Sequence, residues 1–227
     1  MLIPRAFYPL AFICIMLSGI SLGAKLLEAT PRLSEGRNYP AVPPADTDND
    51  LVIIKGNKAP ALGQITNLKG KVLNTDGSPY KNAVVEIWQS DANGFFVNTE
   101  KRDDKTVKFD RNFQGYGRCD VNGSGEYSFR TVKPVPSAGR AAPHIFIRVK
   151  QGNLELVTTQ LFVRGYEGNK NDDVFKGIKD VLNRELVQAD FKAPTDPKGE
   201  ISAEFDIVIG GRGLDASRIV PQESPEP

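Results

Sequence analysis

The stretch ITNLKGKVLNTDGSPYKNAVVEIWQS, residues 65–90, sets the pattern that much of the chain repeats. Its two apolar segments, 65–74 and 83–90, are rich in β-branched residues, and the turn-forming pairs Asp-Gly and Ser-Pro stand between them. We therefore expect two strands joined by a turn. Trp88 lies among apolar neighbours in the second strand, so we expect it in the core.

The same alternation of strand-like segments and turns continues downstream. GYGRCDV (115–121) and EYSFRTV (126–132) flank NGSG, and this pattern predicts a β-hairpin. HIFIRVK (144–150) and LELVTTQLFV (154–163) flank QGN, which predicts a second hairpin. ISAEFDIVIG (201–210) is expected to be a closing strand.

One segment has helical rather than strand periodicity. Within residues 171–187 the apolar residues Val174, Ile178, Val181 and Leu182 recur at helical spacing, with aspartates near the start. Many short strands and one late helix predict an all-β fold, a β-sandwich with long loops. Chemistry in such folds is carried by loops that the rigid sheets position.

The rest of the chain is divided by its composition. Residues 25–60 are proline-rich and lack periodicity, so we expect an extended N-terminal arm against a sandwich spanning 61–210. The acidic run at 46–50 lacks the glycine and glutamate of an EF-hand calcium loop, which favours a solvated turn. Residues 98–112 are charged and predict a long surface loop, and the polar, proline-rich tail 211–227 predicts disorder.

The N-terminus has the pattern of an export signal. Residues 1–24 contain a short basic start, an apolar run and a finish of small residues, as signal peptidase requires. An uncleaved membrane anchor is the alternative, although Pro9 within the run favours cleavage. Removal of Cys14 with the signal would leave Cys119 as the only thiol, so an exported domain, periplasmic or extracellular, would depend on its core rather than on disulfides.

Composition bounds the possible partners. The chain has 227 residues, 40% of them hydrophobic, and a formal net charge of +1 from 29 basic and 28 acidic side chains. Such a balance is ordinary for a globular domain. It provides no positive field for nucleic acid, and no basic patch with interleaved aromatic residues is present, so we expect no nucleic-acid partner.

The order of motifs resembles that of the intradiol ring-cleavage dioxygenases, the protocatechuate and catechol dioxygenase family. The resemblance runs from about residue 30 to residue 210. It implies a β-sandwich, a ferric iron that binds a catechol, and insertion of O2 between the two hydroxyl-bearing carbons. It also implies a homo-oligomer. The motifs are TPRLSEGRNYP, GKVLNTDGSPYKNAVVEIWQSDANG, DRNFQGYGR, GSGEYSFRTVKPVP, GRAAPHIFIRV and TTQLFV.

In that family two histidines and two tyrosinates hold the iron, because ferric iron prefers anionic oxygen with imidazole. The resemblance places the first histidine on His144 and the second on Phe146, which has no donor atom. One tyrosine position falls on Ser137. The other falls on Lys105 or, with a shifted alignment, on Phe96. Three of the four positions are therefore predicted to have lost their ligand.

Two polar positions of the family pattern remain. Arg140 matches the arginine that stabilises charge on bound substrate, and Gln160 matches a glutamine beside the iron. Either these residues line a retained pocket for an anionic or hydroxylated ligand, or Arg140 pairs with a carboxylate and Gln160 hydrogen-bonds within the sheet. His144 would then be a relic of the metal site, with Phe146 filling space that iron would need. One extra residue separates Arg140 from His144 relative to the family spacing.

Two functions follow as hypotheses. In the first, the chain is an exported, non-catalytic family member that serves as a binding or structural module, holds no cofactor, and takes a small aromatic or polar ligand or a partner chain. In the second, it is an active non-haem iron dioxygenase that uses Fe(III), with an altered metal site, to cleave catechol-type aromatic diols. Iron content and oxygen uptake distinguish them.

Overall fold

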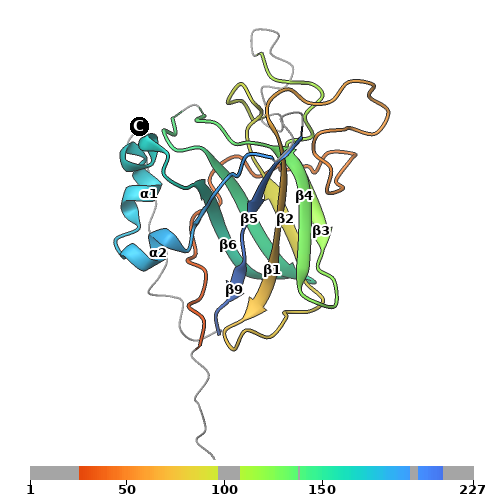
Figure 1. The fold of residues 1–227 in the computed structure, drawn as a ribbon. Coiled ribbons are helices and arrows are strands. Elements are labelled where there is room, and N and C mark those ends of the chain that lie inside the picture. Colours follow the sequence, from red (N-terminus) through yellow and green to blue (C-terminus); the bar gives the residue numbers. More distant parts are fainter. Residues whose placement is uncertain (1–25, 97–107, 138, 195–198, 212–227) are drawn as a thin grey trace, which may run out of the picture.

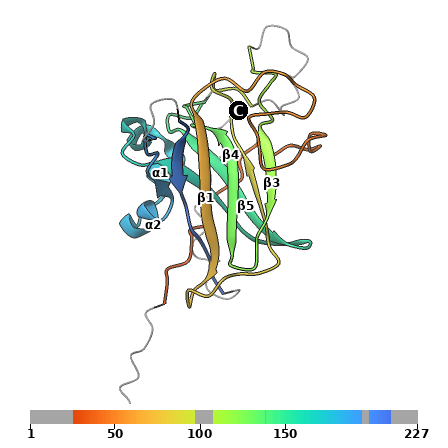
Figure 2. The ribbon, with the colours of Figure 1, turned by 45° about the vertical axis from the view of Figure 1, so that its right-hand side comes forward.

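The computed structural model describes residues 26–96, 108–137, 139–194 and 199–211, drawn in colour in Figure 1. The predicted signal segment and the predicted tail beyond Gly211 lie outside these ranges. Among the described residues, no helix is long and apolar enough to cross a membrane. Most of the regular structure is β-strand, arranged as two sheets packed face to face (Figures 1 and 2).

The first sheet has four strands and is organised around its longest one. This central strand pairs antiparallel with β4 and parallel with both β8 and β9. Along it, buried Leu68 and Val72 alternate with exposed Lys69 and Lys71, so one face packs on the core and the other meets solvent. The strands are β1 (Ile65–Asn74), β4 (Glu126–Val132), β8 (Ile201–Glu204) and β9 (Ile207–Ile209).

The second sheet has five strands in the order β3-β2-β5-β6-β7. The predicted hairpin around QGN is confirmed, because β5 and β6 pair antiparallel across it. The strands are β2 (Val84–Trp88), β3 (Tyr116–Asp120), β5 (His144–Gln151), β6 (Leu154–Val163) and β7 (Gln188–Ala189). Apolar residues of both inner faces form one continuous core between the sheets, which confirms the predicted all-β sandwich.

The hairpin predicted over residues 115–132 is wrong. β3 pairs with β2, where Cys119 lies opposite Val85, whereas β4 pairs with β1, where Phe129 lies opposite Leu68. The turn between β3 and β4 therefore carries the chain from one sheet to the other. Turn residues show that the chain reverses, but the burial of apolar faces decides which strands pair.

The predicted closing strand is divided into β8 and β9. Between them, the carbonyl oxygen of Phe205 lies close to Gly70. A Cβ atom at Gly70 would lie only 1.8 Å from that oxygen. The Tyr127 hydroxyl donates to the same oxygen at 2.5 Å. The glycine in β1 thus allows a close backbone approach where the ladder is interrupted, and β8 and β9 pair with β1 in the same register on either side of it.

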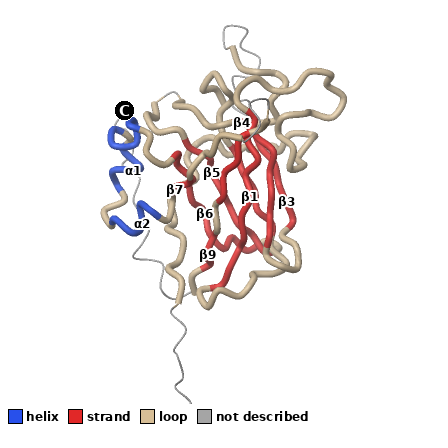
Figure 3. Tube along the Cα trace, viewed as in Figure 1, coloured by secondary structure: helices blue, strands red, loops and turns tan. Residues whose placement is uncertain are grey.

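The predicted late helix is two short helices, α1 (Asp173–Gly177) and α2 (Val181–Glu185), after the 3-10 helix η1 (Glu167–Asn171). The side chain of Asp180 accepts a hydrogen bond from Asn183 N and starts a new helix where the first one has ended. Ile178 is buried between the two helices, but the side chains of Val181 and Leu182 are exposed. The helices lie beside the five-stranded sheet (Figure 3).

The segment predicted as an arm has little regular structure and runs along the sandwich from its lower end (Figure 1). Leu33 N donates to Thr158 O of β6 at 2.9 Å, so the arm lies on the five-stranded sheet. Further on, Leu51 N donates to Arg130 O and Arg118 N donates to Thr47 O. The arm thereby covers exposed backbone at the edges of β3 and β4.

Candidate functional site

The sole histidine lies at the start of β5, on the face of the five-stranded sheet that points away from the central core. Ile145 and Ile147 point into that core, and the alternation of a strand therefore puts His144, Phe146 and Arg148 on the opposite face. All three are buried, because the arm covers this face, with Gly36 against Phe146 and the Tyr39 ring against Arg148. The candidate site is thus a covered sheet face.

His144 has one hydrogen bond and one free lone pair. Its Nδ1 lies 2.8 Å from Ala142 O, and since a carbonyl only accepts, Nδ1 carries the proton. Nε2 is then an acceptor, and it has no partner among the described residues. Burial, together with the charge of Arg140, lowers the pKa of His144 to about 4, so the ring is neutral at neutral pH.

Phe146 occupies the place expected for a second metal-binding histidine. Its ring stacks on Trp88 at 5.2 Å with an interplanar angle of 4°, and the His144 ring meets its edge at 4.8 Å. Phe96 packs on it at 6.1 Å. The backbone of Gly36, at a φ of +67°, leaves room for the ring, since a Cβ there would lie 3.0 Å from Phe146 Cζ. We call Trp88, Phe96 and Phe146 the aromatic cluster.

Arg140 is held by two side chains. It donates from Nε and Nη2 to the two oxygens of Asp172, at 2.7 and 3.0 Å, and from Nη2 to Gln160 Oε1 at 2.9 Å. Gln160 in turn donates to Ser34 O of the arm at 2.7 Å. In this structure Arg140 therefore pairs with a carboxylate, and Gln160 joins it to the arm rather than bonding within the sheet.

Asp172 is the acidic centre of that network. It is 1% exposed, and besides Arg140 it accepts hydrogen bonds from the backbone N–H groups of Ala142 and Phe175. Burial disfavours the charged carboxylate, but the hydrogen bonds and charge of Arg140 outweigh burial and hold the pKa of Asp172 below its usual value. The network therefore carries a buried ion pair at the N-terminus of α1.

The remaining predicted ligand positions supply no anionic oxygen. Ser137 is partly exposed and forms a β-bridge with Arg140 through the backbone. Gly94, in the turn before Phe96, packs against Pro136 O. The turn that contains Gly94 therefore lies next to the segment that contains Ser137. Lys105 lies outside the described residues.

The described residues around His144 do not fit a ferric ion. A ferric site needs several convergent donors, with anionic oxygen among them. Phe146, Phe162 and the Arg140 guanidinium lie near this imidazole, and the Asp172 carboxylate that also acts on it is already bound by Arg140. No group of three His, Cys, Asp or Glu residues in the described part of the chain could hold a metal ion.

Two features of this face were not predicted from the sequence. One is Asp172 as the partner of Arg140, for which the only signal was an aspartate at a helix start. The other is Arg148, which lies 4.1 Å from the ring centre of Tyr39 and forms ion pairs with Glu35 and Glu155. A charged residue within the apolar run of β5 was the signal for the second.

The sandwich fold and the order of these motifs are those expected of an intradiol ring-cleavage dioxygenase, and comparison with known proteins supports this class. The profile of the family described as Dioxygenase matches residues 35–211. The protocatechuate 3,4-dioxygenase beta chain of Burkholderia cepacia is 31% identical over 173 residues, covering 73% of this chain and 72% of that one. The chain belongs to the intradiol ring-cleavage dioxygenase family.

Two further relatives define how far the similarity extends. The hydroxyquinol 1,2-dioxygenase of Nocardioides simplex is 29% identical over 171 residues, which are 66% of this chain and 55% of that protein. The solved structure of an intradiol ring-cleavage dioxygenase from Tetranychus urticae superposes with a TM-score of 0.60 at 19% identity, covering 86% of this chain and 100% of that one. At that identity the superposition shows the fold alone.

Proposed function

We propose that this chain is an exported, non-catalytic member of its family that keeps the sandwich as a binding or structural module. The observation that carries the proposal is the aromatic cluster. The ring of Phe146 stands where a second imidazole would be needed and is locked between Trp88 and His144. Aromatic carbon rings at this place supply none of the donors that iron needs.

The state of Arg140 supports the same proposal. Stabilising charge on a bound diol would require the guanidinium to face open space. Instead it is bound to Asp172 and Gln160, and its side chain is 17% exposed. Freeing it would leave the Asp172 carboxylate buried and unpaired, which is costly.

The alternative is an active iron dioxygenase that cleaves catechol-type diols with an altered metal site. One observation favours it: His144 Nε2 is a neutral nitrogen without a partner among the described residues, which is the form that binds metals. A single imidazole without further donors is a weak ligand for iron, so we prefer the first proposal.

Oxygen consumption distinguishes the two. The purified chain, supplied with iron, is mixed with catechol, protocatechuate or hydroxyquinol in an oxygen-electrode cell, with a catalytically active intradiol dioxygenase as the positive control. We expect no oxygen uptake above the rate of free iron. Turnover that yields the ring-opened dicarboxylic acid would overturn the proposal.

Export and self-association are further parts of the proposal. Export rests on the apolar run and small residues within 1–24. Association of subunits is supported by relatives named as the beta and alpha chains of protocatechuate 3,4-dioxygenase. N-terminal sequencing of the secreted protein tests the first, and light scattering of the purified chain tests the second.

A further inference from the structure

A second region of the molecule, away from the His144 face, has an open space. A cavity of about 710 Å³ lies between the arm and β3. Its volume is within the usual range for small-molecule sites. We call it the arm cavity. Its lining residues come from arm residues 44–48 and 54–55, from 113–114, and from Arg118 and Asp120 of β3.

Gln114 lines this cavity and has an unsatisfied acceptor. The side chain is 3% exposed, and its Nε2 donates to Asp48 O at 3.0 Å and to Tyr116 O at 2.8 Å. These two bonds fix the amide, since a flipped amide would place its oxygen against two carbonyls. Oε1 then has no hydrogen-bond partner among the described residues. Because Oε1 is itself enclosed, a donor from outside the chain reaches it only when the lining shifts.

The charged groups that line the cavity offer more acceptors. Asp46 uses one carboxylate oxygen to accept from Lys55 N at 2.7 Å, and Asp48 uses one to accept from Asp50 N at 2.8 Å. Each has a second oxygen, and among the described residues the Asp120 side chain forms only an exposed pair with Arg118 at 4.0 Å. The lining thus presents carboxylate oxygens from three side chains.

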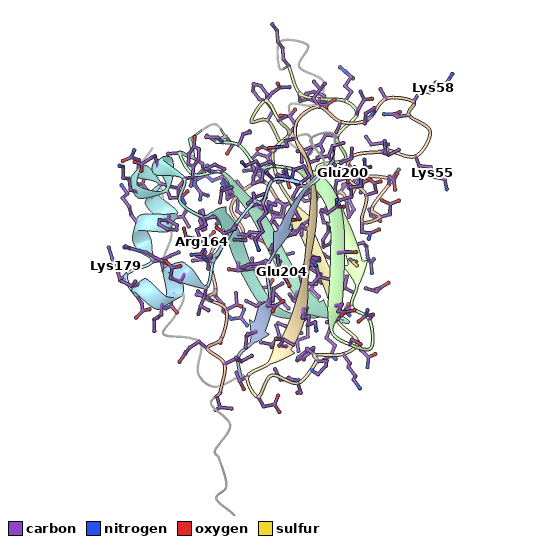
Figure 4. All side chains as sticks on the ribbon, in the orientation of Figure 1. Lys55, Lys58, Arg164, Lys179, Glu200 and Glu204 are labelled. Atoms are coloured by element: carbon purple, nitrogen blue, oxygen red, sulfur yellow. The ribbon has the colours of Figure 1, made fainter. Side chains whose placement is uncertain are left out.

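Donors and apolar surface complete the lining. Lys55, on the projecting loop at the upper right of Figure 4, and Arg118 supply two cationic donors. Pro44, Ile54 and Phe113 supply apolar surface. Three carboxylates and two cationic side chains give the lining a net charge of only −1. A cationic ligand would be repelled by the two cationic side chains, and an acidic ligand would be repelled by the three carboxylates.

We propose that the arm cavity binds a neutral, polyhydroxylated ligand, a pyranose sugar unit. Its hydroxyls would donate to the second carboxylate oxygens of Asp46 and Asp120 and, after a shift of the lining, to Gln114 Oε1, and would accept from Lys55 and Arg118. Its C–H face would pack on the apolar side of the lining. Sites that are built to bind hydroxyl groups lose much of their affinity when one of the polar partners is removed. This site is independent of the His144 face and of any iron.

The test is a binding titration of the full chain with methyl glycosides of glucose, mannose and galactose, followed by ligand-observed NMR. Choline and glucuronate serve as the cationic and acidic probes. We expect saturable binding of at least one methyl glycoside at millimolar concentration, and weaker binding of both charged probes. Absence of saturation by all three glycosides, or tighter binding of choline or glucuronate, would overturn the proposal.

A pair of variants ties the binding to this cavity. Asp46→Asn with Asp120→Asn removes two carboxylates while keeping the side-chain shapes, and we expect the dissociation constant to rise at least about tenfold. Glu204→Gln, an exposed carboxylate on the other sheet (Figure 4), is the control and should leave binding within about twofold. Thermal unfolding of each variant checks that it is folded. Equal affinity in the double variant and the wild type would place the sugar elsewhere and contradict the proposal.

Discussion

The His144 face and the arm cavity differ in how they use polar groups. At the His144 face, aromatic rings fill the space and the charged groups bind one another, as Arg140 binds Asp172 and Gln160. At the arm cavity, space stays open and Gln114 Oε1 has no partner among the described residues. On our proposals, the His144 face serves as part of the core, whereas the loop-lined side binds a ligand.

If the His144 face is core, removing its central ring should be very costly. We expect Phe146→Ala to destabilise the chain by about 3–5 kcal/mol, because it leaves a cavity between Trp88 and His144. Phe95→Ala, at a residue that is 37% exposed, is the matched control and should cost less than about 1 kcal/mol. Urea unfolding measures both. Equal losses for the two variants would mean that the cluster is not packed as a core.

The buried ion pair should give the next largest effect. Asp172→Ala leaves the Arg140 guanidinium without its carboxylate, and we expect a loss of about 3 kcal/mol, since the 17% exposure of Arg140 lets water compensate in part. Asp173→Ala, the next residue, pairs with Lys176 on the surface and should change stability by less than about 1 kcal/mol. A small effect of Asp172→Ala would show that Arg140 is free to serve a ligand.

The pKa of His144 gives a smaller, pH-dependent effect. With a pKa of about 4 in the folded chain and about 6.5 when unfolded, the unfolded state holds the extra proton between these pH values. Stability contributed by the neutral ring is therefore full above pH 6.5 and decreases as the pH falls towards 4, by about 2 kcal/mol at pH 5.

Because the chain has one histidine, NMR of the labelled imidazole reads this pKa directly. We expect the ring to titrate far below pH 6.5 in the folded chain. The slope of stability between pH 6.5 and 5 should decrease in His144→Gln. A ring that titrates near 6.5 would mean that this face is open to water and would contradict its description as core.

Much of the fold could be predicted from the sequence because its signals are local. The alternation of buried and exposed residues in β1 and the QGN turn between β5 and β6 are properties of neighbouring residues. The partners of β3 and β4 could not be predicted in the same way. Their turn reverses the chain, but which sheet each strand joins depends on apolar faces far apart in sequence.

In the candidate site, too, only the features with a local signal could be predicted from the sequence. The prediction that Phe146 supplies no metal ligand comes from the residue itself, since phenylalanine has no donor. The pairing of Arg140 with Asp172 is not, because 32 residues separate them and only the folded chain brings them together. Likewise, nothing local indicates that Gly36 lies over Phe146 or that Gln114 lines a cavity.

The most direct test of the central claim is the iron content and visible spectrum of the purified full-length chain, measured after incubation with ferric iron and removal of the excess. We predict a colourless protein with far less than one iron per chain, because no group of three His, Cys, Asp or Glu residues in the described part of the chain could hold the ion and the Asp172 carboxylate is bound by Arg140. One tightly bound iron per chain, with the visible charge-transfer band of a tyrosinate ligand, would show that the metal site is retained.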